Sequence, residues 1–161
     1  MKTLIKNGLV IDPANLVQTH LNLLLEDGKV AAVTEEEPEA DRVIDAAGKV
    51  VAPGFIDIHM HEDPVKDDKI QFCIFDAMLR MGVTTAVGGN CGINVYDPVK
   101  YLDLLERDGA PVNVMMFAGH QYYREAAGAL DKYSPVTEEQ RKMMKKGLEE
   151  ALEAGCVGIS Y

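Results

Sequence analysis

The chain has 161 residues, 47% of them hydrophobic, and its 26 Asp and Glu against 16 Lys and Arg give a formal net charge of −10 at pH 7. Its length and composition suit a globular protein with a real core, and its charge argues against nucleic acids and anionic membranes as partners. No apolar run approaches a membrane span, and the start of the chain does not suit a signal peptide, so we expect a cytoplasmic protein. Three cysteines in a chain of this length indicate reduced thiols rather than a disulfide framework.

The first 52 residues predict a small antiparallel layer. Apolar runs that suit strands, separated by turn residues, occupy residues 4–6, 9–11, 21–25 and 29–33. Asp27-Gly28 lies between two of these runs and predicts a hairpin turn. The acidic segment 35–39 contains Pro38 and predicts a solvated loop.

After Pro53 the pattern changes to a strand followed by a helix, repeated along the chain. Residues 55–58 are almost wholly apolar, which predicts a buried strand, and residues 83–87 predict a second. Between them apolar residues recur at helical spacing up to Gly82, which predicts a helix over 70–81. These apolar residues are Ile70, Ile74, Ala77, Met78 and Met81.

Two further helices are indicated by their capping residues. Asp97-Pro98 predicts an N-cap followed by proline at the first helical position, and a third strand follows at 112–117. Thr137 and Gln140 have the spacing of a capping box, and Gly155 lies where that helix would end. Residues 156–160 then predict the start of a fourth strand.

Four strands with intervening helices make half of a parallel β/α architecture, so we assign the α/β fold class. A complete (β/α)8 barrel needs roughly 250 residues. We therefore expect residues 53–161 to form the first four β/α units of a (β/α)8 barrel, incomplete at the C-terminus. A four-stranded open α/β sheet is the alternative that the length permits.

Two histidines follow the first strand of this series, and they are the first candidate site residues. His59 and His61 are two residues apart, so in an extended chain both imidazoles share a face, as two ligands of one metal must. A buried pair of imidazoles needs a metal or carboxylate partners. Asp57, Glu62 and Asp63 are near enough to act as ligands or as hydrogen-bond acceptors, but all three also suit an ordinary turn. The alternative is a chance pair at the end of a surface strand.

Cys91 is the second candidate, because it lies in a glycine-rich segment directly after the second strand. The glycines allow the backbone to come close and present Cys91 as a thiolate ligand or a nucleophile. A lone cysteine is more often a small buried residue, but the register with His59 and His61 favours a ligand. Cys73 and Cys156 lie away from this edge, and we expect both to be packing residues.

A connection of about 18 residues follows the third strand, and loops of that length usually carry function. Arg124 suits a clamp on a substrate carboxylate, with Tyr122 and Tyr123 as pocket walls and His120 as a hydrogen-bond donor. The alternative is a surface loop in which Arg124 pairs with Glu125.

The passage 44–61, which ends in Phe55-Ile56-Asp57-Ile58-His59-Met60-His61, resembles the signature that opens the barrel in the amidohydrolase superfamily. The segments 82–85 and 89–92 resemble the D-aminoacylase (N-acyl-D-amino-acid deacylase) branch. The resemblance covers essentially the whole chain, and it implies that residues 1–52 supply strands of a small composite β-sandwich domain.

This resemblance implies a metal-dependent hydrolase that cleaves C–N bonds of N-acyl amino acids or related small amides with metal-activated water. His59, His61 and Cys91 match the metal ligands of the family, and the implied metal is zinc, as one or two divalent ions. The family's remaining histidine ligands and its general base, an aspartate, come from later strands, so no catalytic residue is expected within this chain. Gly119-His120 matches the family pattern, whereas Tyr122 and Tyr123 depart from it.

Two other interpretations remain open from the sequence. The chain by itself is a truncated fragment that binds metal without catalysis, and the remaining half-barrel or a second copy of the chain closes it. Alternatively, it is a dihydroorotase-like or hydantoinase-like member of the same superfamily. Cys91 argues against this second alternative, because those enzymes generally lack a cysteine ligand after strand two.

Overall fold

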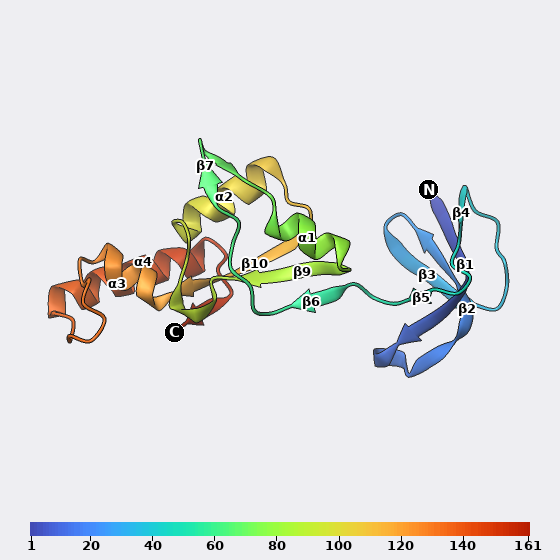
Figure 1. Ribbon diagram of the computed structural model, residues 1–161, viewed down its shortest axis with the longest axis horizontal. Coiled ribbons are helices and arrows are strands. Elements are labelled where there is room, and N and C mark those ends of the chain that lie inside the picture. Colours follow the sequence, from blue (N-terminus) through green and yellow to red (C-terminus); the bar gives the residue numbers. More distant parts are fainter. The chain divides into compact units, whose positions relative to one another are not determined.

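The computed structural model describes residues 1–161, which divide into two compact units, Met1–Pro53 and Gly54–Tyr161 (Figure 1). None of the helices combines the length and the apolar composition that crossing a membrane requires.

The first unit is a five-stranded sheet in which β3, β2, β1 and β4 are neighbours in that order and β5 also pairs with β1. Its elements are β1 (Lys2–Asp12), the short 3-10 helix η1 (Pro13–Asn15), β2 (Val17–Glu26), β3 (Lys29–Thr34), β4 (Arg42–Asp45) and β5 (Val50–Val51). The pairs β1–β2 and β2–β3 are antiparallel, whereas β4 and β5 run parallel to β1.

The hairpin predicted at Asp27-Gly28 is confirmed, and both residues have positive φ, as a tight turn between β2 and β3 requires. The two strands expected at 4–6 and 9–11 form one strand, β1, so that expectation was wrong. A β-bulge lies between Ile5 and Gly8, and Asn7 within it has φ 63°. The Asn22 carboxamide oxygen accepts a hydrogen bond from the Asn7 amide, which satisfies a group that the bulge removes from the ladder.

The second unit contains four parallel strands in the order β11, β10, β9 and β6. Its elements are β6 (Phe55–Asp57), β7 (Val65–Lys66), β8 (Lys69–Ile70), α1 (Ile74–Arg80), β9 (Val83–Gly88), η2 (Asn90–Gly92), α2 (Pro98–Asp108), β10 (Asn113–Gly119), α3 (His120–Ala126), α4 (Glu138–Glu153) and β11 (Gly158–Ser160). All four predicted strands of this series are therefore present.

Helices cover one face of this sheet, and a single hydrophobic core lies between the two layers. The largest core side chains include Phe75 from α1, Tyr101 from α2 and Met116 from β10. The other face is open, since Ile56 and Met115 remain 65% and 42% exposed. The expectation of a buried first strand was therefore wrong for this chain, because β6 is an edge strand that pairs only with β9.

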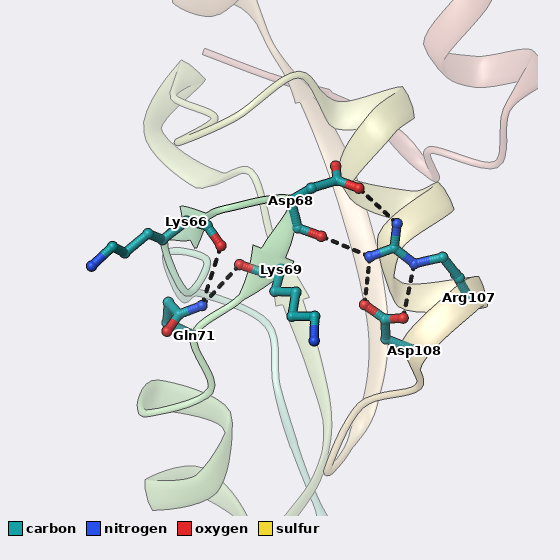
Figure 2. Close-up of polar contacts among 6 residues, drawn as sticks. All are labelled: Lys66, Asp68, Lys69, Gln71, Arg107 and Asp108. Carbon is teal, nitrogen blue, oxygen red and sulfur yellow. Dashed lines mark hydrogen bonds and ion pairs between the residues drawn. The ribbon is translucent and has the colours of Figure 1, made fainter.

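The helix predicted over 70–81 begins at Ile74, and Ile70 lies in β8 of a short hairpin with β7. Asp67 and Asp68 both have positive φ and form the tight turn of this hairpin. Figure 2 shows how the turn is fastened: the Arg107 guanidinium at the end of α2 pairs with the carboxylates of Asp68 and Asp108. The apolar spacing was misleading at Ile70, because one buried residue in a two-residue strand has the same sequence spacing as a buried residue in the first turn of a helix.

The start of α1 is set by Asp63, a fully buried residue ten positions before Cys73 in the chain. Its carboxylate accepts hydrogen bonds from the backbone amides of Cys73, Ile74 and Phe75 and from the Cys73 thiol. Burial by itself would raise the pKa of Asp63, but these hydrogen bonds hold it below its ordinary value. Tyr101 donates its hydroxyl to the Asp63 carbonyl, so the chain after His61 is anchored twice.

The other two helix starts are confirmed. The Asp97 carboxylate accepts from the Lys100 amide at the beginning of α2, and Thr137 and Gln140 form a complete capping box before α4. The connection after β10 is not a long irregular loop as expected, because its first seven residues form α3.

Replacing Asp63 with alanine would leave three amides at the start of α1 without an acceptor, and the amide of Phe75 among them is buried. We expect Asp63→Ala to lower the free energy of unfolding of residues 54–161 by about 2 kcal/mol. The chain has six tyrosines, all at or after position 96, and no tryptophan, so tyrosine fluorescence during urea unfolding reports on this unit. The control is Asp12→Ala, which removes an exposed cap in the first unit and should leave this transition unchanged.

Candidate metal centre

His59 and His61 follow β6, beyond the carboxyl end of that strand. The Asp57 carboxylate accepts a hydrogen bond from the His59 amide, which turns the chain out of the strand. The two imidazole ring centres are 6.3 Å apart and the ring planes are nearly perpendicular. Both side chains are exposed, so the expected burial of this pair was wrong for this chain, and the cause is again the edge position of β6.

Cys91 lies in η2, directly beyond the carboxyl end of β9, and its backbone has φ 58°. Gly89 and Gly92 on either side also have positive φ. A left-handed conformation at a non-glycine residue costs about 1–3 kcal/mol and persists only where the surroundings impose it. The conformation brings the Cys91 sulfur to 3.3 Å from Nε2 of His59.

The three residues suit one divalent metal ion. One ligand atom from each of His59, His61 and Cys91 lies within 4.8 Å of the others. Two ligands held at about 2.0–2.3 Å from a tetrahedral ion are roughly 3.3–3.7 Å apart, which the His59–Cys91 separation matches. Two imidazole nitrogens and one thiolate form a donor set that favours zinc over magnesium or calcium. A thiol–imidazole hydrogen bond would also explain that separation, but it would not require His61 nearby.

Side chains from neighbouring segments hold the Cys91 segment in place. The Asn90 carboxamide donates to the carbonyl oxygens of Val87 and Met60. The Ser160 hydroxyl, at the end of β11, accepts from the Gly92 amide and donates to the Gly89 carbonyl oxygen. The supporting roles of Asn90 and Ser160 were not predicted from the sequence, because all of their partners except Val87 are distant in the chain.

The three acidic neighbours of the histidines have other partners. Asp57 bonds to the His59 amide, Asp63 caps α1, and Glu62 accepts from the Asn94 carboxamide. None of them belongs to the group of three ligand residues.

Cys156 is buried, as expected. Cys73 is exposed, so its expected packing role was wrong: its thiol donates to Asp63 at the start of α1.

The four residues proposed to bind substrate lie on α3, but they do not point to one place. The His120 ring lies 5.5 Å from the Tyr161 ring, and the Tyr122 hydroxyl donates to the Asp97 carboxylate. Burial, together with this carboxylate, raises the pKa of Tyr122 to about 12.

The other two are engaged elsewhere. Tyr123 is buried, and its ring lies against Gly147 of α4. Arg124 donates to the carbonyl oxygens of Asp131 and Ser134, in the segment between α3 and α4. Substrate binding by any of the four stays a prediction.

Residues 42–161 match the model of the amidohydrolase family. Among curated proteins, the chain is 32% identical to an N-acyl-D-glutamate deacylase of Alcaligenes xylosoxydans xylosoxydans, over 97% of this chain and 36% of that protein. It is also 44% identical to a dihydroorotase of Elusimicrobium minutum, over 53% of this chain and 20% of that protein. The chain thus spans little more than a third of the length of the first of these relatives.

Two solved structures resemble the chain over 98% of its length and 37% of theirs. One is an N-acyl-D-glutamate deacylase from Bordetella bronchiseptica, complexed with zinc and a phosphonate that mimics the tetrahedral intermediate (30% identity, TM-score 0.79). The other is a D-aminoacylase variant in complex with copper chloride (29% identity, TM-score 0.83). The resemblance to the D-aminoacylase branch is confirmed, and so is a parallel half-barrel of the (β/α)8 class. The chain belongs to the amidohydrolase family.

Proposed function

We propose that this protein is a metal-dependent hydrolase of non-peptide amide C–N bonds that removes the acyl group from N-acyl-D-amino acids. The observation that carries the proposal is the convergence of His59, His61 and Cys91 beyond the ends of two parallel strands. Parallel β/α enzymes place their reactive groups at this edge of the sheet. The similarity to an N-acyl-D-glutamate deacylase and to a D-aminoacylase supports the same reaction.

In this proposal His59, His61 and Cys91 hold one divalent ion, with zinc as the leading candidate. A zinc ion in such a site lowers the pKa of a bound water and polarises the carbonyl of the scissile amide. Cys91 donates as a thiolate, and Asp57 fixes the turn that presents His59. A second ion needs ligands beyond these three.

The groups that move protons are expected outside these residues, on the later strands of a complete barrel. This fits the share of the deacylase relatives that the chain spans. The alternative is that the 161 residues are a metal-binding fragment without catalysis of its own. A second copy of the chain or the remaining half-barrel as a separate chain would then close the sheet.

Removing one ligand should abolish tight metal binding without unfolding the protein. We expect Cys91→Ala and His59→Ala to lose more zinc affinity than the roughly 10–100-fold that loss of a ligand's hydrogen-bond partner costs. Metal content after dialysis, measured by mass spectrometry, checks this. Cys73→Ala is the matched control, because its exposed thiol lies at the start of α1 and should leave metal content unchanged. Full zinc content in Cys91→Ala would contradict the assignment of the site.

The substrate class separates the two leading enzyme hypotheses. We expect the native protein to release the carboxylic acid from N-acyl-D-amino acids and to leave the L-enantiomers and dihydroorotate unchanged. Amine release and ring opening are followed in parallel assays. The local identity to a dihydroorotase supports the other hypothesis, a dihydroorotase-like enzyme. Hydrolysis of dihydroorotate, with no hydrolysis of N-acyl-D-amino acids, would establish that hypothesis.

The length of the native protein decides between enzyme and fragment. We expect its intact mass to lie well above the 17.6 kDa of this chain, with zinc in the same sample. A mass of 17.6 kDa per chain would instead favour the fragment interpretation, whether or not the sample holds metal. Native mass spectrometry measures the mass and the bound metal together.

A further inference from the structure

One buried carboxamide connects the segments that follow three neighbouring strands. Asn94, three residues after Cys91, is 8% exposed. Its Nδ2 donates to Oε1 of Glu62 at 3.0 Å and to the Phe117 carbonyl oxygen at 3.1 Å. Its Oδ1 accepts from the Gly119 amide at 2.7 Å. Its partners thus lie after β6 and at the end of β10, while Asn94 itself follows β9.

Two of these three partners are next to a candidate site residue. Glu62 directly follows His61, and Gly119 directly precedes His120. A shift of the Asn94 side chain would therefore act on the segments that carry His61 and His120. Neither Asn94 nor Glu62 belongs to the group of ligand residues, so any effect on the metal has to act through His61 and Cys91.

The bonding pattern requires an amide at position 94. The Glu62 carboxylate and the Phe117 carbonyl are acceptors, whereas the Gly119 amide is a donor. Asparagine supplies two N–H donors and one acceptor and matches all three. Aspartate has the same shape, but it would direct a carboxylate oxygen at two acceptors in a buried place.

Glycines at the strand ends allow these segments to approach closely. A Cβ at Gly89 would overlap the Phe117 carbonyl oxygen and lie 2.8 Å from Nδ2 of Asn94. A Cβ at Gly119 would lie 2.5 Å from the Gly92 carbonyl oxygen. The backbone is thus shaped so that the Asn94 side chain reaches both neighbours.

Glu62 is almost fully buried, and its Oε2 has no hydrogen-bond partner. A carboxylate with one free oxygen costs stability in such a place, and a core that needed only packing would be better served by an apolar side chain. The Glu62 carboxylate thus costs stability, which is typical of a group whose role is to fix the position of its neighbours.

We infer that Asn94 and Glu62 are positioning residues, and that the hydrogen bond between them holds His61 and Cys91 at the separation that one metal ion requires. The inference rests on the proposed metal centre. Neither residue touches the metal or the substrate. Their effect is on the affinity and geometry of the site.

Asn94→Asp tests the inference on the full native protein with zinc and cobalt as probes. We expect zinc affinity, measured by chelator competition, to fall about 10–100-fold, as for loss of other groups that orient metal ligands. The thiolate-to-cobalt absorption band should weaken, because the sulfur no longer lies at bonding distance. The control is Asn113→Asp, which should leave both readouts unchanged. The Asn113 carboxamide lies on an exposed part of β10 and donates to the Thr84 carbonyl oxygen of β9.

Rescue separates positioning from general destabilisation. Glu62→Gln keeps an acceptor for Asn94 and should retain wild-type zinc affinity. In the double variant Asn94→Asp with Glu62→Gln a donor again faces an acceptor, so part of the lost affinity should return without a matching rise in the thermal midpoint. A recovery of thermal midpoint with no recovery of affinity would overturn the inference.

The outcomes also separate this inference from the proposed metal site. Equal zinc affinity in wild type and in Cys91→Ala would refute the metal site itself. If Cys91→Ala loses zinc but Asn94→Asp does not, only the positioning role is refuted. Should Asn94→Asp not fold, Glu62→Ala decides: wild-type zinc affinity or failure to fold in that variant would both overturn the inference, the latter because the pair would be a structural part of the core.

Discussion

Parallel pairing of β6 with β9 is the constraint on which the candidate site depends. Their register places Asp57 beside Ala86, so the residues that follow both strands emerge at the same edge of the sheet. His59 and Cys91 are 32 positions apart in the chain and meet there at 3.3 Å. An antiparallel pairing would have carried the two segments to opposite ends of the sheet. Backbone pairing of the two strands is thus what brings the histidines and Cys91 to the same edge of the sheet.

The regular ladder stops short of the site, and individual side chains take over beyond it. Asn90 and Ser160 hydrogen-bond to backbone groups on either side of the left-handed Cys91, and Asn94 hydrogen-bonds to the backbone at the end of β10. On the other side of His61, Asp63 and Tyr101 anchor the chain to α1 and α2. The candidate ligands are thus the exposed ends of segments whose supports are buried. Such an arrangement holds ligands rigidly while leaving them accessible.

Capping and turn chemistry could be predicted from the sequence because these interactions span only a few residues. Asp97 and Thr137 cap their helices, and Asp27-Gly28 turns the hairpin, as their local motifs indicate. Ile70 was assigned to the wrong element because burial of a short strand imitates helical spacing. The exposure of His59 and His61 also differed from expectation, since burial depends on the layers that cover a strand and not on its own residues.

The sequence by itself determined the alternation of strands and helices, the helix boundaries marked by Asp97 and Thr137, and the three candidate ligands, because each is encoded in adjacent residues. Only the tertiary structure decided which groups support those ligands and where α3 directs its side chains. Asn94, Asp63 and Ser160 act on partners at least ten positions away, so no local pattern marks them. The position of Tyr123 is likewise determined by packing against α4, and that of Arg124 by hydrogen bonds to carbonyl groups seven and ten positions further along the chain. Long-range hydrogen bonds and burial are properties of the folded chain, and they emerge only when its segments meet.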